Sequence, residues 1–287
     1  MKKICIMLTL LILSVSAFAQ KGKVGTSVSL VGSVEPEKLA EIKAAGIDYI
    51  EVTMNLFVRK QPENEVYIKA YKALADIKAS GLKVWSVHLP YSSKWDPSII
   101  DPAKREEALL FFEEMIRLAG IFEPACLVLH PGADNIKNAN TREERLKCAR
   151  NSIGRLALAA KEIGAVLCVE TLPRTCPGRT AEENDYLTAD IPNVKVCFDT
   201  NHLLIDNHED VFAKVGDRIG TIHVSDYDRV DEKHWLPLNG RGVVDWPAFC
   251  RNLKKCGYKG VFMFESRGDG VDAEGVMRVY KQMRRMK

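Results

Sequence analysis

The stretch Val166-Leu-Cys-Val-Glu170 decides the fold together with three others of the same kind: Val194-Lys-Val-Cys-Phe-Asp199, Gly220-Thr-Ile-His223 and Val261-Phe-Met-Phe-Glu265. Each is apolar, rich in β-branched or aromatic residues, and preceded by a helix-like segment. Short buried runs of this kind are typical of strands in a parallel sheet. Each predicted strand therefore places a carboxylate or an imidazole at the point where it ends.

The same pattern extends along the whole chain, as strand-like runs alternating with amphipathic segments. The runs are residues 24–30, 47–53, 83–88, 125–130, 165–170, 194–199, 219–224 and 260–265. Predicted helices cover residues 36–45, 67–80, 102–120, 141–163 and 270–287, and another begins at Asp245-Trp246-Pro247. Several of them end at a glycine just before the next strand, namely Gly46, Gly81, Gly164 and Gly257. Eight βα units predict a single (β/α)8 TIM barrel, in which strand ends converge on one face. A flat, doubly wound sheet is the alternative left open.

Residues 1–19 have the features of a cleaved secretory signal peptide. Lys2 and Lys3 precede an apolar run over residues 4–15, and Ala17-Phe18-Ala19 has the small-x-small pattern of a cleavage site. We therefore expect residues 20–287 to form the barrel domain and to be exported to the periplasm. Removing both lysines from the 41 basic residues leaves 39 against 38 acidic ones. This balance predicts no nucleic-acid partner, and the apolar run is too short to predict a membrane span.

The cysteines predict a mostly buried set of free thiols. Eight cysteines become seven after cleavage at residue 19, and Cys126, Cys168 and Cys197 lie in or beside apolar strands. Free cysteine is among the most buried residue types. Pairing among Cys176, Cys250 and Cys256 stays open, because an exported protein meets an oxidising compartment.

The four residues at the strand ends predict a metal site. Glu170, Asp199, His223 and Glu265 offer three carboxylates and one imidazole, a hard donor set that suits one divalent ion such as Mn²⁺, Co²⁺, Mg²⁺ or Zn²⁺. A six-coordinate ion would keep two positions open, which two adjacent oxygens of a sugar can fill. The alternative is that each residue acts separately, for instance as the cap of the next helix.

Three further histidines are candidates for the same face of the barrel. His88 and His130 end the third and fourth predicted strands, and His202 follows Asp199 by three residues. Each could instead have a local role, by bonding a loop carbonyl or capping a helix. Four aromatic residues on predicted loops or helix starts are candidates for stacking on a sugar, namely Tyr91, Trp95, Trp235 and Trp246.

Six short motifs are spread over nearly the whole mature chain: His88-x-Pro-Tyr, His130-Pro-Gly, Glu170-Thr, Asp199-Thr-Asn-His202, His223-Val-x-Asp226 and Glu265. Taken together, these motifs resemble the xylose isomerase-like barrel superfamily. The resemblance to its ketose epimerases implies that Glu170 and Glu265 bind metal and move protons, while Asp199 and His223 only hold the ion. It also implies that His202 and Arg229 bind substrate oxygens, and we place His88, His130 and Trp246 in the same substrate site.

The superfamily also contains endonuclease IV, which this chain resembles with one departure. Its trinuclear zinc site uses residues that match His88, His130, Glu170, Asp199, His202, His223 and Glu265. That enzyme also needs an Asp-x-His pair after the seventh strand, but Asp231 and His234 are separated by two residues here. The departure argues against a third zinc ion, and the near-neutral charge argues against abasic DNA as the substrate.

Such a site suits removal of a proton beside a sugar carbonyl. Three outcomes share this first step: isomerisation, epimerisation, and elimination of a β-substituent. Export favours the breakdown of a small-molecule sugar or glycoside, and exported members of the superfamily include enzymes resembling 3-keto-glycoside 1,2-lyases. We therefore expect a 3-keto-glycoside 1,2-lyase with Glu170 or Glu265 as the base and His88, His130 or His202 as the acid. The alternatives are a sugar isomerase, a ketose 3-epimerase or a non-catalytic carbohydrate binder.

Overall fold

The structure is a computed structural model that describes residues 23–28, 34–134, 139–268 and 271–286. The predicted signal peptide, residues 1–19, lies outside the described residues. Among the helices that are described, none is long and apolar enough to cross a membrane.

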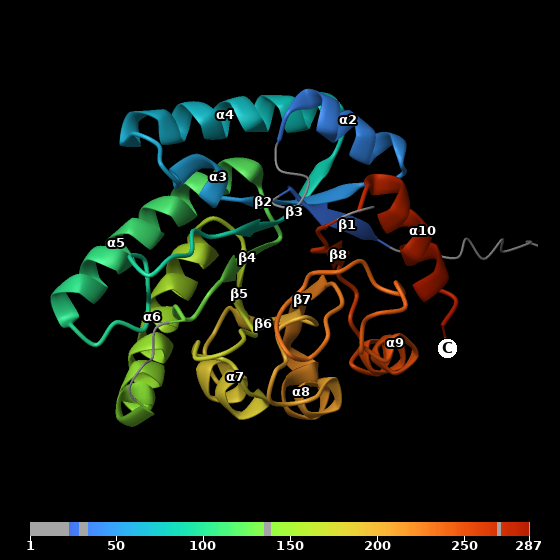
Figure 1. The fold of residues 1–287 in the computed structure, drawn as a ribbon. Helices are drawn as coiled ribbons and strands as arrows, with labels where there is room; N and C mark the ends of the chain where they lie inside the picture. Colours follow the sequence, from blue (N-terminus) through green and yellow to red (C-terminus); the bar gives the residue numbers. More distant parts are fainter. Residues whose placement is uncertain (1–22, 29–33, 135–138, 269–270, 287) are drawn as a thin grey trace, which may run out of the picture.

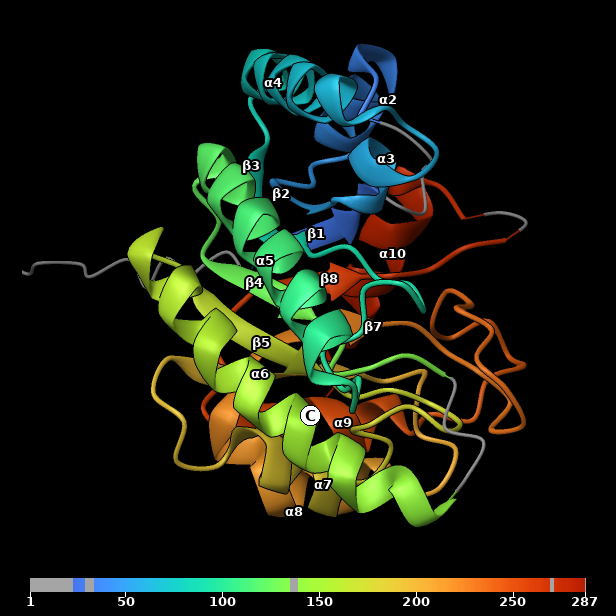
Figure 2. The same cartoon turned by 90° about the vertical axis from the view of Figure 1, so that its left-hand side faces the viewer.

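Eight parallel strands close into a barrel in sequence order, with β1 pairing both β2 and β8. The ring of helices around these strands is seen in Figure 1, and Figure 2 shows the barrel turned by 90°. The strands are β1 (Val24–Ser27), β2 (Tyr49–Thr53), β3 (Lys83–His88), β4 (Cys126–Leu129), β5 (Val166–Glu170), β6 (Val194–Asp199), β7 (Ile219–Val224) and β8 (Phe262–Phe264). All eight predicted strands and the (β/α)8 barrel are confirmed, and the flat sheet is excluded. Residues 29 and 30 of the first predicted run lie outside the described residues.

The predicted helices are also present, with ends that lie within four residues of the predicted ones; residues 270 and 287 of the last predicted helix lie outside the described residues. The helices are α2 (Pro36–Ala44), α3 (Asn55–Val58), α4 (Glu63–Ser80), α5 (Pro102–Ala119), α6 (Arg142–Glu162), α7 (Ala181–Thr188), α8 (His208–Val215), α9 (Trp246–Lys255) and α10 (Ala273–Met283). We did not predict the short α3, α7 and α8. Local capping explains α8, because the Asn207 side chain accepts from the Asp210 amide and Asp210 accepts from the Asn207 amide.

Glycine stops set the direction in which the chain enters the next strand. Gly81 ends α4 in the left-handed conformation with φ of 72°, and Gly164 has φ of 78° between α6 and β5. A side chain at these angles would be strained, which is why glycine is preferred there. All four predicted stops have positive φ, at Gly46, Gly81, Gly164 and Gly257.

The inside of the barrel changes from apolar to polar along its axis. One buried cluster within it contains Cys126, Val128, Cys168 and Cys197. The ends of the strands instead carry buried polar groups such as Glu51 and Ser86, as well as the predicted metal ligands. All seven cysteines of the described residues are free, so pairing among Cys176, Cys250 and Cys256 is not found. The apolar cluster forms a packed floor beneath the polar groups.

Candidate metal centre

The four predicted ligands meet at the end of the barrel. Glu170, Asp199, His223 and Glu265 place one ligand atom each within 4.8 Å of all the others. His223 Nδ1 is central, at 3.0 Å from Glu170 Oε1, 2.9 Å from Glu265 Oε2 and 3.7 Å from Asp199 Oδ2. Strand pairing places Asp199 directly opposite His223 on β6 and β7. The convergence expected from the strand ends is therefore observed.

The donor set fits a divalent cation. The side chains of Glu170, Asp199 and Glu265 are 1%, 0% and 14% exposed, and carboxylates buried this closely repel one another unless a cation compensates them. Asp199 Oδ2 is buried and has no hydrogen-bond partner in the described part of the chain. Burial opposes ionisation of Glu170, yet the positive charges of His130 and His223 hold its pKa well below the usual range. Burial likewise opposes ionisation of Asp199 and Glu265, but nearby positive histidines lower the pKa of both. All three carboxylates are therefore ionised and available as ligands.

Glu51 supports the ligand His223 from behind. This carboxylate lies on β2 and is 0% exposed; its Oε2 accepts from His223 Nε2 over 2.9 Å and from Ser86 Oγ over 2.8 Å. The contact turns His223 Nδ1 toward the other three ligands. A carboxylate behind a metal-binding imidazole fixes the ring and raises its basicity. We did not predict this role, although an acidic residue within the apolar strand Ile50-Glu51-Val52 was a usable signal.

His88 and His130 contact the other oxygen of Glu170. Their Nε2 atoms lie 3.2 Å and 2.9 Å from Glu170 Oε2, and these three residues form a second group that could hold an ion. Burial by itself would lower the pKa of His88, but its hydrogen bond to Glu170 and the charge of that carboxylate raise it to about 9. His88 Nδ1 also contacts the Leu89 carbonyl over 2.9 Å, so both of its ring nitrogens are engaged. The group around His223 offers four ligand atoms, three of them from carboxylates, against three in the group of His88, His130 and Glu170. We therefore expect a single ion, bound beside a hydrogen-bonded Glu170.

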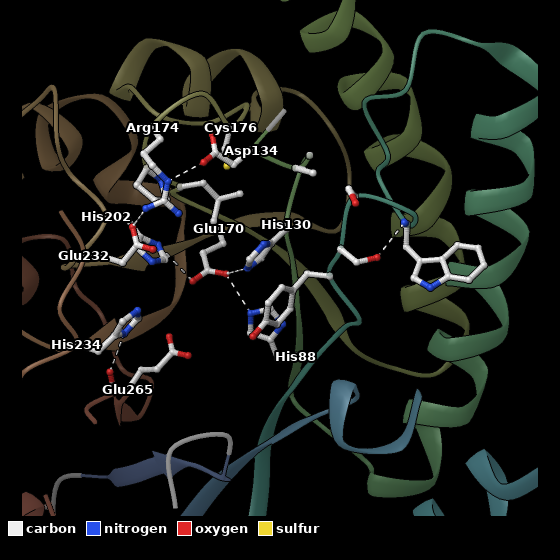
Figure 3. A pocket seen from close by; sticks show the side chains of 18 of the residues that line it. His88, His130, Asp134, Glu170, Arg174, Cys176, His202, Glu232, His234 and Glu265 are labelled. Carbon is white, nitrogen blue, oxygen red and sulfur yellow. Dashed lines mark hydrogen bonds and ion pairs between the residues drawn. The ribbon is translucent and has the colours of Figure 1, made fainter. Parts of the chain in front are cut away.

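His202 lies on the other side of Glu170 from His88 and His130 (Figure 3). His202 Nδ1 donates to the Thr171 carbonyl over 2.9 Å and lies 3.4 Å from Asp199 Oδ2. This leaves His202 Nε2 as the ring nitrogen that can hydrogen-bond a substrate. The His234 ring stands perpendicular to His202 with centroids 5.6 Å apart, so the two imidazoles border one corner of the site.

A salt-bridge cluster around Arg174 shapes the rim. Arg174, in the loop after β5, donates to Asp134 over 2.7 Å, to Asp231 over 2.9 Å and to Glu232. These ion pairs join the loops that follow β4, β5 and β7. Glu232 and His234 line the pocket, whereas the expected Asp231 pairs with Arg174 and has a half-exposed side chain. Within the described residues, Glu232 and His234 belong to no group of three close ligand atoms. The expectation that no third zinc is bound stays a prediction.

A pocket of about 380 Å³ opens above the candidate metal centre. Its volume is in the range of about 300–1,000 Å³ that small-molecule sites occupy. Figure 3 shows Glu170 and Glu265 extending into it, the first from the end of β5 and the second from the residue directly after β8. The lining includes the expected His88, His130 and His202, the aromatic residues Tyr91 and Trp95, and two arginines, Arg174 and Arg267.

Two expected substrate residues lie elsewhere. Trp246 is only 2% exposed, and its Nε1 donates to Asp226 Oδ2 over 2.8 Å, so it packs under the rim and cannot stack on a ligand. Arg229 is exposed and lies outside the pocket lining. Trp235 also lies outside the lining, with the Arg241 guanidinium 4.7 Å above its ring. The structure therefore does not bring Trp246 and Arg229 into the lining of this pocket, and their expected contact with the substrate stays a prediction.

Comparison with known proteins agrees with the fold. Residues 39–286 match the family described as Xylose isomerase-like TIM barrel. A protein of uncharacterised function from Methanocaldococcus jannaschii is 23% identical over 168 residues, which cover 58% of this chain and 64% of that protein, less than two thirds of its length. The D-psicose 3-epimerase of Enterocloster bolteae is 24% identical over 238 residues, covering 78% of this chain and 74% of the epimerase.

Two solved structures share the barrel. The D-psicose 3-epimerase of Clostridium cellulolyticum, determined with D-tagatose, has a TM-score of 0.74 at 18% identity and covers 92% of this chain and 99% of its own. The 3-keto-D-glucoside 4-epimerase of E. coli has a TM-score of 0.71 at 20% identity, with the same coverage of 92% and 99%. At these identities, the likeness shows the fold alone.

The metal centre predicts about one divalent ion per chain, measured by elemental analysis of the purified protein. Asp199→Ala and His223→Ala should each lose the ion, while Asp217→Ala, whose side chain is 84% exposed, should keep it. Chelation should also lower thermal stability, since an ion at 100 times its Kd stabilises a fold by about 2.7 kcal/mol. Two or three firmly bound ions per chain would contradict the single-ion site.

The contact between Glu51 and His223 predicts a separate effect on metal affinity. Glu51→Gln keeps the size of the side chain but removes its charge, so the Kd for Mn²⁺ should rise by about 10- to 100-fold in calorimetric titration. Ser86→Ala serves as the control, because it removes a neutral donor to the same Glu51 oxygen and should change Kd much less. An unchanged Kd in Glu51→Gln would show that Glu51 does not support the ligand.

Proposed function

Because this chain belongs to the Xylose isomerase-like TIM barrel family, we propose that this enzyme removes a proton from the carbon beside the carbonyl of a sugar. One observation carries the proposal: two glutamates, Glu170 and Glu265, reach the same His223 nitrogen at the floor of a pocket. Glu170, Asp199, His223 and Glu265 would hold a divalent ion, which when bound supplies a Lewis acid that polarises the carbonyl.

Glu265 is our candidate for the base. Its side chain is 14% exposed and lines the pocket, whereas that of Glu170 is 1% exposed and is held by His88, His130 and His223. A base needs access to the carbon whose proton it removes. Glu170 would then bind the ion and either return a proton or remain a ligand.

His202 is our candidate for the acid. Its Nδ1 is bound to a carbonyl, which leaves Nε2 to deliver a proton, and imidazole titrates near neutral pH. His88 and His130 both contact Glu170, and His130, whose side chain is 22% exposed, would bind a sugar hydroxyl at the edge of the site.

We propose a 3-keto-glycoside as substrate and elimination as the outcome. Glu265 takes the proton from carbon 2, the electron pair forms a double bond between carbons 1 and 2, the bond from carbon 1 to the aglycone oxygen breaks, and His202 protonates that oxygen. The shared fold of the 3-keto-D-glucoside 4-epimerase supports this sugar class. The pattern of residues 1–19 supports a periplasmic site of action, where glycosides are broken down.

Epimerisation or isomerisation is the second candidate. It is favoured by the sequence similarity to D-psicose 3-epimerase and by the presence of two glutamates on one centre, because one can remove a proton and the other return it. The first step and its residues are the same in both proposals, and only the fate of the electron pair differs.

Replacing the base should separate binding from turnover. Glu265→Gln nearly preserves shape, so substrate binding should persist while kcat falls by about 10²- to 10⁴-fold in steady-state kinetics. Glu182→Gln is the control, since the Glu182 side chain is 77% exposed and lies outside the pocket lining. If Glu265→Gln and Glu170→Gln both keep wild-type turnover with the ion bound, these carboxylates are not the base.

The fate of the proton can be followed by NMR with methyl 3-keto-β-D-glucoside in deuterated water. Elimination should release methanol and leave a 2-hydroxy-3-keto-glycal, and the reaction should stop with chelator and resume with Mn²⁺ or Co²⁺. Deuterium gained at the enolised carbon with the glycosidic bond intact would instead support epimerisation or isomerisation.

A further inference from the structure

A second pocket lies beside the metal pocket and shares a wall with it. Its volume is about 440 Å³, and Tyr91, Ser92 and Trp95 line both pockets. The far wall is formed by α4 and α5, through residues such as Tyr67 and Phe111. The proposed reaction uses only the first pocket, so the second is left without a role.

The shared wall connects the second pocket to the proposed catalytic groups. The Tyr91 ring stacks on His130 with centroids 4.5 Å apart, and the Arg59 guanidinium lies 5.6 Å from the Tyr91 centroid. Trp95 stacks on Phe111 at 3.8 Å. A ligand group in the second pocket would therefore lie one aromatic ring away from the histidines around Glu170.

The lining has the mixed chemistry of a carbohydrate site. Tyr67 is 41% exposed, and its hydroxyl donates to Glu114 over 3.0 Å. Around this ring lie the polar side chains of Asn55, Gln61 and Ser92, together with three cations, Arg59, Lys60 and Lys94. Aromatic surface next to several hydrogen-bonding groups matches a sugar ring, which has apolar faces and a rim of hydroxyls. With Glu114 as the only carboxylate in the lining, this pocket does not favour a cationic group.

We propose that this second pocket binds the leaving sugar of a disaccharide-type glycoside. The proposal rests on the proposed function: the keto sugar would lie over Glu265 in the first pocket, and the second ring would pass Ser92 into the second. The leaving group is then a sugar, and Tyr67 contributes to its recognition without touching the reacting carbons.

Binding of unreactive glycosides tests the proposal independently of turnover. Methyl β-cellobioside and methyl α-maltoside carry no 3-keto group and no free carbonyl, so calorimetry on the Mn²⁺-loaded protein measures affinity alone. At least one should bind about tenfold more tightly than methyl β-D-glucoside. Tyr67→Ala should remove about three- to tenfold of that affinity and leave methyl β-D-glucoside unchanged.

Tyr71→Ala is the matched control, because Tyr71 lies one turn further along α4, is 56% exposed and is outside the pocket lining. Glu114→Gln provides a second pocket variant in case Tyr67→Ala lowers the melting temperature too far, and its loss of affinity should also be confined to the disaccharides.

Equal binding of mono- and disaccharides, or equal affinities in all variants, would overturn the proposal. Tyr67-dependent binding of 4-nitrophenyl β-D-glucoside without disaccharide binding would overturn it in favour of an aromatic aglycone. If disaccharide binding depends on Tyr67 but no 3-keto-glycoside is cleaved, the lyase proposal fails and the sugar pocket remains.

Discussion

The repulsion among three buried carboxylates is the constraint on which this structure depends. Glu170, Asp199 and Glu265 come from three strands and meet around one nitrogen of His223. With so little contact with water, such a group is costly unless positive charge compensates it. Protonated histidines can do so in part, but Asp199 Oδ2, which is buried and has no hydrogen-bond partner among the described residues, marks the place where a divalent ion fits better. The barrel provides the geometry, because only its closed sheet brings these strand ends together.

The sequence was sufficient for the parts of the site that depend on strand ends. Glu170, Asp199 and His223 could be placed because each ends an apolar run, and the strand ends of a (β/α)8 barrel all lie on the face that carries the active site. Glu51 could not be placed in this way, because its role depends on facing His223 across the barrel. The loops were harder still. Asp226 accepts a hydrogen bond from Trp246 and so holds that side chain beneath the rim. Arg174 joins three loops through ion pairs between residues far apart in the sequence, which no local sequence pattern reveals.

Family membership and the strand-end residues bear on the class of enzyme, whereas the loops around the site bear on the outcome of the reaction. The family match shows the fold and family, and together with the carboxylate pair it supports our proposal of a metal-dependent enzyme that acts beside a sugar carbonyl. In that proposal the fate of the sugar depends on the groups around the centre, namely the partly exposed Glu265, the Nε2 atom of His202 and the pocket beyond Tyr91. Barrels of one fold change chemistry through such loops while their strand-end residues stay in place.

The most direct test of the central claim is the position of the ion. Anomalous diffraction at the manganese absorption edge, from crystals grown with Mn²⁺, would locate it without reference to activity. The account predicts one strong peak within bonding distance of Glu170, Asp199, Glu265 and His223 Nδ1, and no comparable peak between His88 and His130. No peak at the four ligands, or a stronger peak at the two histidines, would contradict it.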